Sequence, residues 1–259
     1  MNSFLYLFPA IFTVSNMFFG FWSIILSIKG DFIKASWLII FGILADGLDG
    51  VVARAKKITS FLGIELDSLA DIITFCIAPM VLIWQLIMYK YGFGGIVICF
   101  LYIFFGAVRL ARFNVIAYSK EDKTKPFPYI EGLPTPAAAG VIVSIVFLVS
   151  TSSSDYYLTK RHITLLVSLM PTILNFLPAI ILVLSILMVT KFRYLKFNNI
   201  KLNQRISFRL FSLILVVVLL LFAYPETSIF LIFATYLLSG LVDYLLRMYK
   251  ISKSKHTIK

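Results

Sequence analysis

Long apolar runs dominate the chain, and most are about long enough to cross a bilayer. The runs are continuous and do not alternate as barrel strands do, so they predict transmembrane helices and make strands unexpected. Turn-forming stretches such as Lys29-Gly30-Asp31 and Tyr224-Pro225-Glu226 separate them. We therefore predict transmembrane helices over residues 10–28, 32–54, 63–89, 93–118, 134–152, 163–190, 207–223 and 227–246. In the sixth, Pro171 and Pro178 leave open whether one helix forms or a short piece followed by a full crossing.

Composition supports this interpretation. Apolar residues make up 60% of the 259 positions, and the mean hydropathy is +0.95, far above that of a soluble globular domain. The length fits one compact bundle and leaves no room for a separate soluble domain. We therefore predict an all-α, polytopic membrane bundle of about eight helices, in a single domain over residues 1–259.

The basic residues indicate how the bundle is oriented. With the N-terminus in the cytoplasm, 19 of the 24 lysines and arginines border the loops 54–62, 119–133 and 191–206 or the C-terminal tail. This is a clear positive-inside bias. Because the charges are spread among loops beside the spans, orientation and anionic lipid explain the net charge of +12 better than nucleic acid does. We expect a multi-pass protein of the cell (inner) membrane, with no nucleic-acid partner.

Four aspartates interrupt two of the apolar runs near their predicted cytoplasmic ends. Asp46 and Asp49 are three residues apart in the second run, and Asp67 and Asp71 are four apart in the third, so each pair shares a helix face. A carboxylate at the centre of a membrane helix costs about 2.5–3.5 kcal/mol or more, so four together need compensation. A short turn joins the two helices, and both faces can look into one cavity. Hard oxygen ligands suit Mg²⁺, Mn²⁺ or Ca²⁺, so we predict one or two divalent ions here.

Small and basic residues accompany the aspartates. Gly50, Ala53 and Gly63 leave space for a ligand to approach the backbone, or for helices to pack closely. Arg54 is suited to contact a phosphate by charge-assisted hydrogen bonds. The alternatives are a buried ion-pair cluster and the proton relay of a transporter. A purely structural cluster is disfavoured, because the basic residues of the adjoining turn do not balance four acids.

The pattern D-x2-D-G-x2-A-R-x8-G-x3-D-x3-D, from Asp46 to Asp71, resembles the signature of the CDP-alcohol phosphotransferase family without a mismatch. That family transfers a phosphatidyl-type group from a CDP-linked donor to an alcohol and releases CMP. The resemblance implies that the four aspartates bind two metal ions, that Asp71 is also the general base, and that the enzyme is a homodimer. It further implies that the other motif residues line the CDP site, namely Gly50, Ala53, Arg54 and Gly63.

Two further stretches narrow the choice of alcohol. R-L-A-R-F-N closes the fourth run, and G-L-P-T-P-A-A-A opens the fifth. Arg109 and Arg112 in the first stretch share a helix face, and arginine suits bidentate binding of a carboxylate or phosphate; membrane anchoring is the alternative for each. Both stretches resemble the bacterial and archaeal type of phosphatidylserine synthase within the family. This resemblance implies CDP-diacylglycerol as the donor and L-serine as the acceptor.

The N-terminal run carries part of the same resemblance. Residues 8–20 are similar to that group's L-P-N-x-x-T-x-x-N-x-x-x-G, with Ala10 where asparagine is usual. Thr13 and Asn16 match the pattern, which assigns them to donor binding; helix packing is the alternative for each. The resemblance covers residues 8–140, and we expect 141–259 to add transmembrane helices and a basic cytoplasmic tail.

Two rival functions stay open. A sister enzyme would use glycerol 3-phosphate, inositol phosphate or choline instead of serine; the arginine pair and the G-L-P-x-P-A-A-A stretch favour serine. An ion-coupled transporter would use the aspartates as a cation site. It would carry its acids near the midplane on broken helices, whereas these acids lie toward one face of the membrane.

Overall fold

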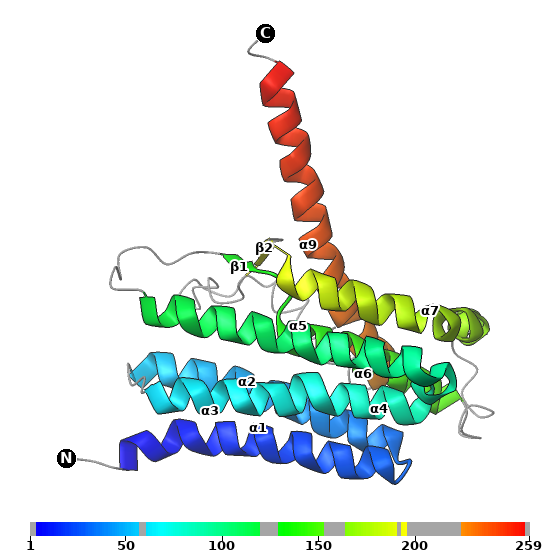
Figure 1. The fold of residues 1–259 in the computed structure, drawn as a ribbon, viewed down its shortest axis with the longest axis horizontal. Coiled ribbons are helices and arrows are strands. Elements are labelled where there is room, and N and C mark those ends of the chain that lie inside the picture. Colours follow the sequence, from blue (N-terminus) through cyan, green and yellow to red (C-terminus); the bar gives the residue numbers. More distant parts are fainter. Residues whose placement is uncertain are drawn as a thin grey trace, which may run out of the picture.

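The computed structural model describes residues 4–56, 61–119, 129–152, 164–190, 193–195 and 224–256, and nearly all of them are helical (Figure 1). The elements follow in the order α1 (Phe4–Ile28), α2 (Phe32–Lys56), α3 (Phe61–Asp71), η1 (Ile72–Ile77), α4 (Ala78–Leu86), η2 (Met88–Tyr91), α5 (Gly92–Ser119), β1 (Tyr129–Glu131), α6 (Thr135–Ser152), α7 (Thr164–Val189), β2 (Arg193–Leu195) and α9 (Pro225–His256). The all-α class predicted from the apolar runs is confirmed.

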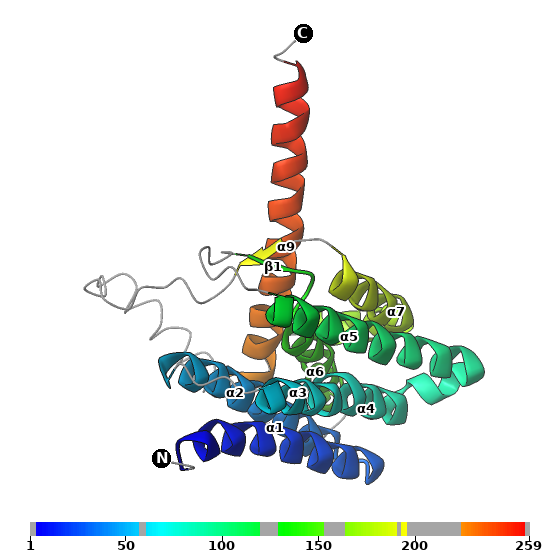
Figure 2. The same cartoon turned by 60° about the vertical axis from the view of Figure 1, so that its left-hand side comes forward.

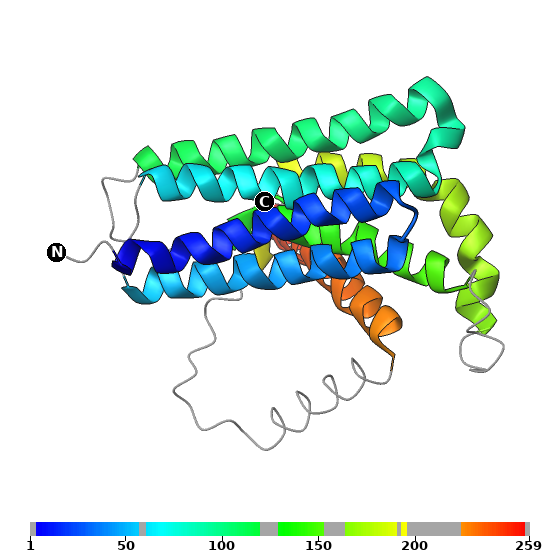
Figure 3. The same ribbon diagram turned by 90° about the horizontal axis from the view of Figure 1, so that it is seen from below.

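The predicted helices match the observed ones to within two residues at each end in α2, α5, α6 and α7, whereas α1 begins six residues before its predicted start. The third predicted span is composite: α3 is followed by the π-helix η1, then by α4 and the 3₁₀ turn η2. The predicted span over 207–223 lies outside the described residues. The sixth is one helix, α7, which contains both prolines and bends along its length (Figure 3), as proline-containing helices do.

Helices α1 to α7 lie side by side as a bundle (Figures 1 and 3). Helix α1 packs along α2 and the composite third segment, α5 packs along α7, and α6 contacts both α2 and α9. Fully buried side chains such as Phe75, Tyr102 and Ile142 form the core between these helices. Large apolar side chains such as Phe93 and Val14 are exposed on the outside. Such an apolar exterior fits a lipid environment.

Among the described residues, three segments are long and apolar enough to cross a membrane, namely Ile11–Ile28, Phe61–Leu86 and Met88–Val115. Shorter apolar helical stretches cover Thr135–Ser150, Leu174–Val189 and Thr227–Gly240. The last belongs to α9, which runs across the bundle instead of along it (Figures 1 and 2). The sequence therefore predicted this helix but not its direction.

A small antiparallel ribbon, which the sequence did not predict, pairs the segment before α6 with the segment after α7. Strands β1 and β2 pair with Glu131 opposite Arg193. Gly132 follows with φ 79°, a conformation that favours glycine, and the position a Cβ would take there is occupied by the carbonyl of Met188. The Leu133 N–H then donates to the carbonyl of Leu187 across 3.0 Å. The segment that leads into α6 is thus fixed against the end of α7.

Candidate active site

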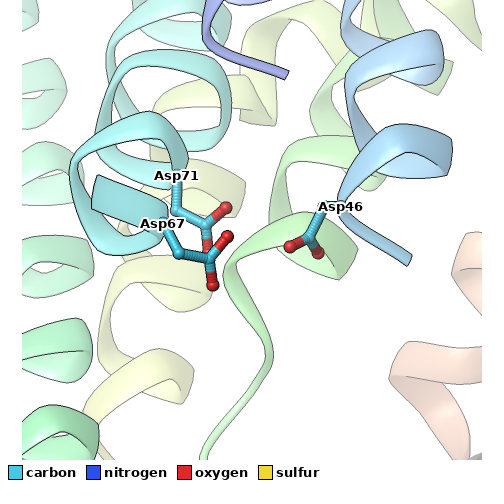
Figure 4. A group of neighbouring side chains, drawn as sticks. All are labelled: Asp46, Asp67 and Asp71. Atoms are coloured by element: carbon cyan, nitrogen blue, oxygen red, sulfur yellow. The ribbon is translucent and has the colours of Figure 1, made fainter. Parts of the chain in front are cut away.

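Three aspartate side chains from two helices point toward one another (Figure 4). Asp46 comes from α2, and Asp67 and Asp71 come from α3. One carboxylate oxygen from each lies within 4.8 Å of the others. Helical periodicity aligns the acids on each helix, and the antiparallel packing of α2 against the third segment brings the two faces together. The predicted convergence of the two acidic helix faces is therefore confirmed for these three carboxylates.

Asp49 lies beside this group and is held by α1. Its side chain is 7% exposed, and it accepts a hydrogen bond of 2.5 Å from the Thr13 hydroxyl. It is close enough for its charge to act on both Asp46 and Asp67. Asp49 is thus part of the same electrostatic cluster, although it does not belong to the group of three converging oxygens.

Asp71 is buried and is also held by α1. The side-chain N–H of Asn16 donates to its carboxylate across 3.2 Å, and Asn16 is fully buried. Because Thr13 and Asn16 are three residues apart, one face of α1 supplies a hydrogen bond to one aspartate from each of the two acidic helices. The structure shows that both polar side chains contact the aspartates, and their assignment to donor binding stays a prediction.

Arg109 on α5 is a buried cation that interacts electrostatically with the aspartates. Its side chain is 8% exposed and stacks over the Phe113 ring, with 4.7 Å from Cζ to the ring centroid. Its charge acts on both Asp46 and Asp71. One guanidinium N–H donates to the Thr135 hydroxyl across 3.4 Å, while Nε has no partner among the described residues. A buried donor without a partner is costly, so this group is suited to bind an anionic ligand.

Asn114, at the end of the same R-L-A-R-F-N stretch, ties α5 to α3. Its side-chain carbonyl accepts a hydrogen bond of 3.1 Å from Ser68, the residue after Asp67, and its N–H donates to Glu65 across 3.4 Å. Glu65 thus contacts a neighbouring helix and does not belong to the converging carboxylates. Arg112 of this stretch is half-buried.

Two residues near Arg109 were not among those predicted from the sequence. Thr135 occupies the unspecified position of G-L-P-x-P-A-A-A, and its fully buried hydroxyl accepts from Arg109. Tyr236 on α9 is partly buried and close enough to interact electrostatically with Arg109. A hydroxyl at a helix start was a usable signal for Thr135. No local signal links Tyr236 to a residue more than a hundred positions away.

The remaining motif residues are placed only in part. Gly63 is an exposed residue in the first turn of α3. Gly50, Ala53 and Arg54 belong to helix α2, but the side chains of residues 50–56 lie outside the described part of the structure. Their predicted contacts with the CDP moiety therefore stay predictions.

The chemistry of the converging groups fits a divalent cation. Carboxylate oxygens are the hard ligands that Mg²⁺, Mn²⁺ and Ca²⁺ prefer. Among the described side chains, no lysine or arginine forms an ion pair with Asp46, Asp67 or Asp71. Arg109 supplies one positive charge near three acids, so cation binding would relieve the remaining repulsion.

The family of the chain is identified by its similarity to known proteins. Residues 6–174 match the family model for CDP-alcohol phosphatidyltransferase. The chain belongs to this family. The resemblance inferred from the motif is confirmed, and with it the chain's assignment as a transferase. Its apolar helices and its family together identify an integral membrane protein.

Individual relatives support the same conclusion. The chain is 36% identical to a CDP-diacylglycerol–serine O-phosphatidyltransferase from Helicobacter pylori, over 97% of both chains. It is 32% identical to the enzyme of that name from Bacillus subtilis, over 54% of this chain and 75% of the relative. It is also 35% identical to an archaetidylserine synthase from Methanothermobacter thermautotrophicus, over 52% of this chain and 56% of the relative.

Proposed function

We propose that this protein transfers the phosphatidyl group of CDP-diacylglycerol to the hydroxyl of L-serine, giving phosphatidylserine and CMP. The observation that carries the proposal is the convergence of Asp46, Asp67 and Asp71 in a chain similar over 97% of its length to a serine-transferring member of the family. The site is suited to the pyrophosphate of the donor, and Arg109 beside it is suited to the acceptor.

Asp46, Asp49, Asp67 and Asp71 would hold the divalent metal, which we propose to be two ions of Mg²⁺ or Mn²⁺, with Ca²⁺ as an alternative. The metal would neutralise charge on the donor pyrophosphate and on the leaving CMP. The protein's part is to hold the carboxylates in place. The hydrogen bonds from Thr13 and Asn16 serve this role, because each fixes one carboxylate oxygen from the side of α1.

Asp71 is the proposed general base. In the reaction, the serine hydroxyl oxygen attacks the phosphorus that bears the diacylglycerol, and the bond from that phosphorus to the oxygen of CMP breaks. The hydroxyl proton passes to the Asp71 carboxylate, and CMP leaves with the bonding electrons. Asp71 suits this task because it is buried and its orientation is set by the Asn16 side chain. We propose direct transfer, without a covalent intermediate on the enzyme.

Arg109 is the proposed ligand of the serine carboxylate. Its guanidinium is buried beside the aspartates, and its unpartnered Nε is suited to donate to a carboxylate oxygen. Arg112 is proposed as a second acceptor residue, one turn further along α5. Choline carries no anionic group for these arginines to bind, so its use would require a different arrangement of this pocket.

For the donor, we propose that the nucleotide contacts Thr13, Asn16, Gly50, Ala53, Arg54 and Gly63. We also propose that the site opens at the cytoplasmic face of the inner membrane, because the basic residues Arg54, Lys56 and Lys57 follow the aspartates of α2 directly in the sequence. A homodimer is likewise proposed, and it rests on the family resemblance alone.

One assay tests the acceptor. The purified protein is incubated with CDP-diacylglycerol, Mg²⁺ or Mn²⁺ and one alcohol at a time, and CMP is measured. Release with L-serine alone supports the proposal. Release with glycerol 3-phosphate, inositol phosphate or choline in place of serine would reassign the acceptor. The absence of CMP with every alcohol, together with cation flux into liposomes, would favour the transporter.

A further inference from the structure

Thr74 is a buried polar residue that neither the sequence motifs nor the proposed reaction uses. It lies in the π-helix η1, which begins directly after Asp71. Its side chain is fully buried, and its hydroxyl donates to the backbone carbonyl of Asn16 on α1 across 2.8 Å. A π-helix of a few residues inside a longer helix is unusual and is often found at functional sites. Thr74 is therefore a candidate for a role in the neighbouring site.

Two glycines make room for this threonine. A Cβ at Gly20 of α1 would collide with the Thr74 hydroxyl and backbone, and a Cβ at Gly42 of α2 would collide with the Thr74 methyl group. The Thr74 side chain thus fills a socket between α1 and α2. The close fit positions η1 against both helices, since a side chain larger than glycine at either position would require Thr74 to shift.

The same α1 residue links Thr74 to Asp71. The backbone carbonyl of Asn16 accepts from Thr74, and the side-chain N–H of Asn16 donates to the Asp71 carboxylate across 3.2 Å. Two hydrogen bonds therefore join Asn16 to the segment Asp71–Thr74, one to each terminal residue of that segment. If the Thr74 bond were lost, one of the two contacts that hold Asn16 against the segment Asp71–Thr74 would be gone, and the side chain that orients the carboxylate would be less firmly held.

We propose that Thr74 is a positioning residue for Asp71: its hydroxyl fixes Asn16, and Asn16 orients the Asp71 carboxylate toward the cation. This inference rests on the proposed metal-dependent transfer. Thr74 acts through Asn16 and does not itself contact the reacting atoms. Groups that orient metal ligands in this way commonly change metal affinity or activity by about 10- to 100-fold when removed.

Two substitutions distinguish the effect of the Thr74 hydrogen bond from the effect of its side-chain packing. Thr74→Val keeps the volume that fills the socket and removes the hydrogen bond, whereas Thr74→Ser keeps the hydroxyl and removes the methyl group. We expect Thr74→Val to weaken Mn²⁺ binding by about 10-fold, measured by electron paramagnetic resonance without lipid donor or serine. We expect its kcat to fall by a similar factor and its KM for serine to stay unchanged. Thr74→Ser should remain close to wild type in both measurements.

Ser23→Ala provides the matched control. Ser23 is fully buried on α1, and its hydroxyl donates to the Ala35 carbonyl of α2 across 2.9 Å. This variant also loses one buried bond between a hydroxyl and the backbone of a neighbouring helix, but away from the aspartates. Its melting temperature should fall about as much as that of Thr74→Val, with Mn²⁺ binding unchanged.

The inference is overturned if Thr74→Val binds Mn²⁺ as wild type does, or if Ser23→Ala weakens binding equally. It is also overturned if Thr74→Ser and Thr74→Val lose affinity to the same extent, because packing alone would then explain the effect. The Mn²⁺ measurement needs no turnover. A wild-type protein that binds Mn²⁺ but releases no CMP would therefore refute the proposed function, and the comparison of variants would still decide the role of Thr74.

Discussion

Arg109 on α5 donates a hydrogen bond to the Thr135 hydroxyl at the first residue of α6, across 3.4 Å. This contact joins two stretches that are separated in the sequence by the loop 119–133. It also fixes one side of a guanidinium whose charge acts on the aspartates and whose Nε has no partner among the described residues. The contact thus helps to hold the proposed acceptor group beside the proposed metal site.

Replacement of Arg109 by lysine should selectively impair serine binding. Lysine keeps the positive charge but cannot form the planar, bidentate contact with a carboxylate. We expect the KM for serine to rise by about 10- to 100-fold, which corresponds to the loss of a charge-assisted hydrogen bond. The KM for CDP-diacylglycerol should change little. Initial rates measured while each substrate is varied in turn would check this expectation.

Thr135→Val is the companion variant for Arg109. It removes the hydroxyl that accepts from the guanidinium but leaves the arginine itself, so we expect a smaller rise in the KM for serine, about 5-fold. If the Arg109→Lys variant changed both KM values equally, Arg109 would have a general structural role and not one in acceptor binding.

Asp71→Asn should abolish turnover while the protein still folds. Asparagine has nearly the same shape and can still pair with Asn16, but it cannot take a proton from the acceptor. We expect kcat to fall by about 100-fold or more, with circular dichroism and melting temperature close to wild type. Turnover at the wild-type rate would exclude Asp71 as the base.

Asp31→Asn is a suitable control for that variant. Asp31 precedes α2 at the end remote from the site, where it accepts hydrogen bonds from the backbone N–H and the ammonium group of Lys34. Asparagine serves as well as aspartate before a helix, so both activity and stability should remain near wild type.

Removal of divalent metal should stop the reaction. Without a cation the clustered carboxylates repel one another and the donor pyrophosphate, so EDTA should reduce CMP release to background, and added Mg²⁺ or Mn²⁺ should restore it. Asp67→Asn should raise the Mn²⁺ concentration that gives half-maximal rate by about 10-fold or more. Full activity in protein shown by elemental analysis to lack metal would contradict the proposed site.

Gly140→Ala should destabilise the protein by disturbing the packing of α6 against α9. A Cβ at this position would collide with the Phe233 ring, so either the ring or the helix must shift. Such overpacking costs about 1–3 kcal/mol, and the melting temperature in detergent should fall. Gly94→Ala is the control, because a Cβ there meets nothing within 4 Å. It should leave the melting temperature unchanged or slightly higher.

If Gly140→Ala proved as stable as Gly94→Ala, the close contact between α6 and α9 would not be needed for stability. A double variant provides a second comparison. In a protein that already carries Phe233→Ala, Gly140→Ala should lower the stability much less than it does in the wild type, since the colliding ring is gone.

The sequence alone predicted most of the described helices and the convergence of three of the four motif aspartates. Apolar runs in lipid must satisfy their own backbone hydrogen bonds, so continuous runs of this length form helices whatever their neighbours are. The convergence of Asp46 with Asp67 and Asp71 follows from the helical period and from the short turn between their helices. The family signature lies in the same local spacing, which is why it was recognisable without a structure.

Contacts between distant segments were decided only by the tertiary structure. The Phe233 ring of α9 fills the space beside Gly140 of α6, and Arg109 of α5 pairs with Thr135 of α6. The socket of Thr74 likewise needs glycines from two other helices. Local spacing determines which side chains share a helix face, but which faces meet depends on the shape of every side chain between them, and that is settled only when the whole bundle packs.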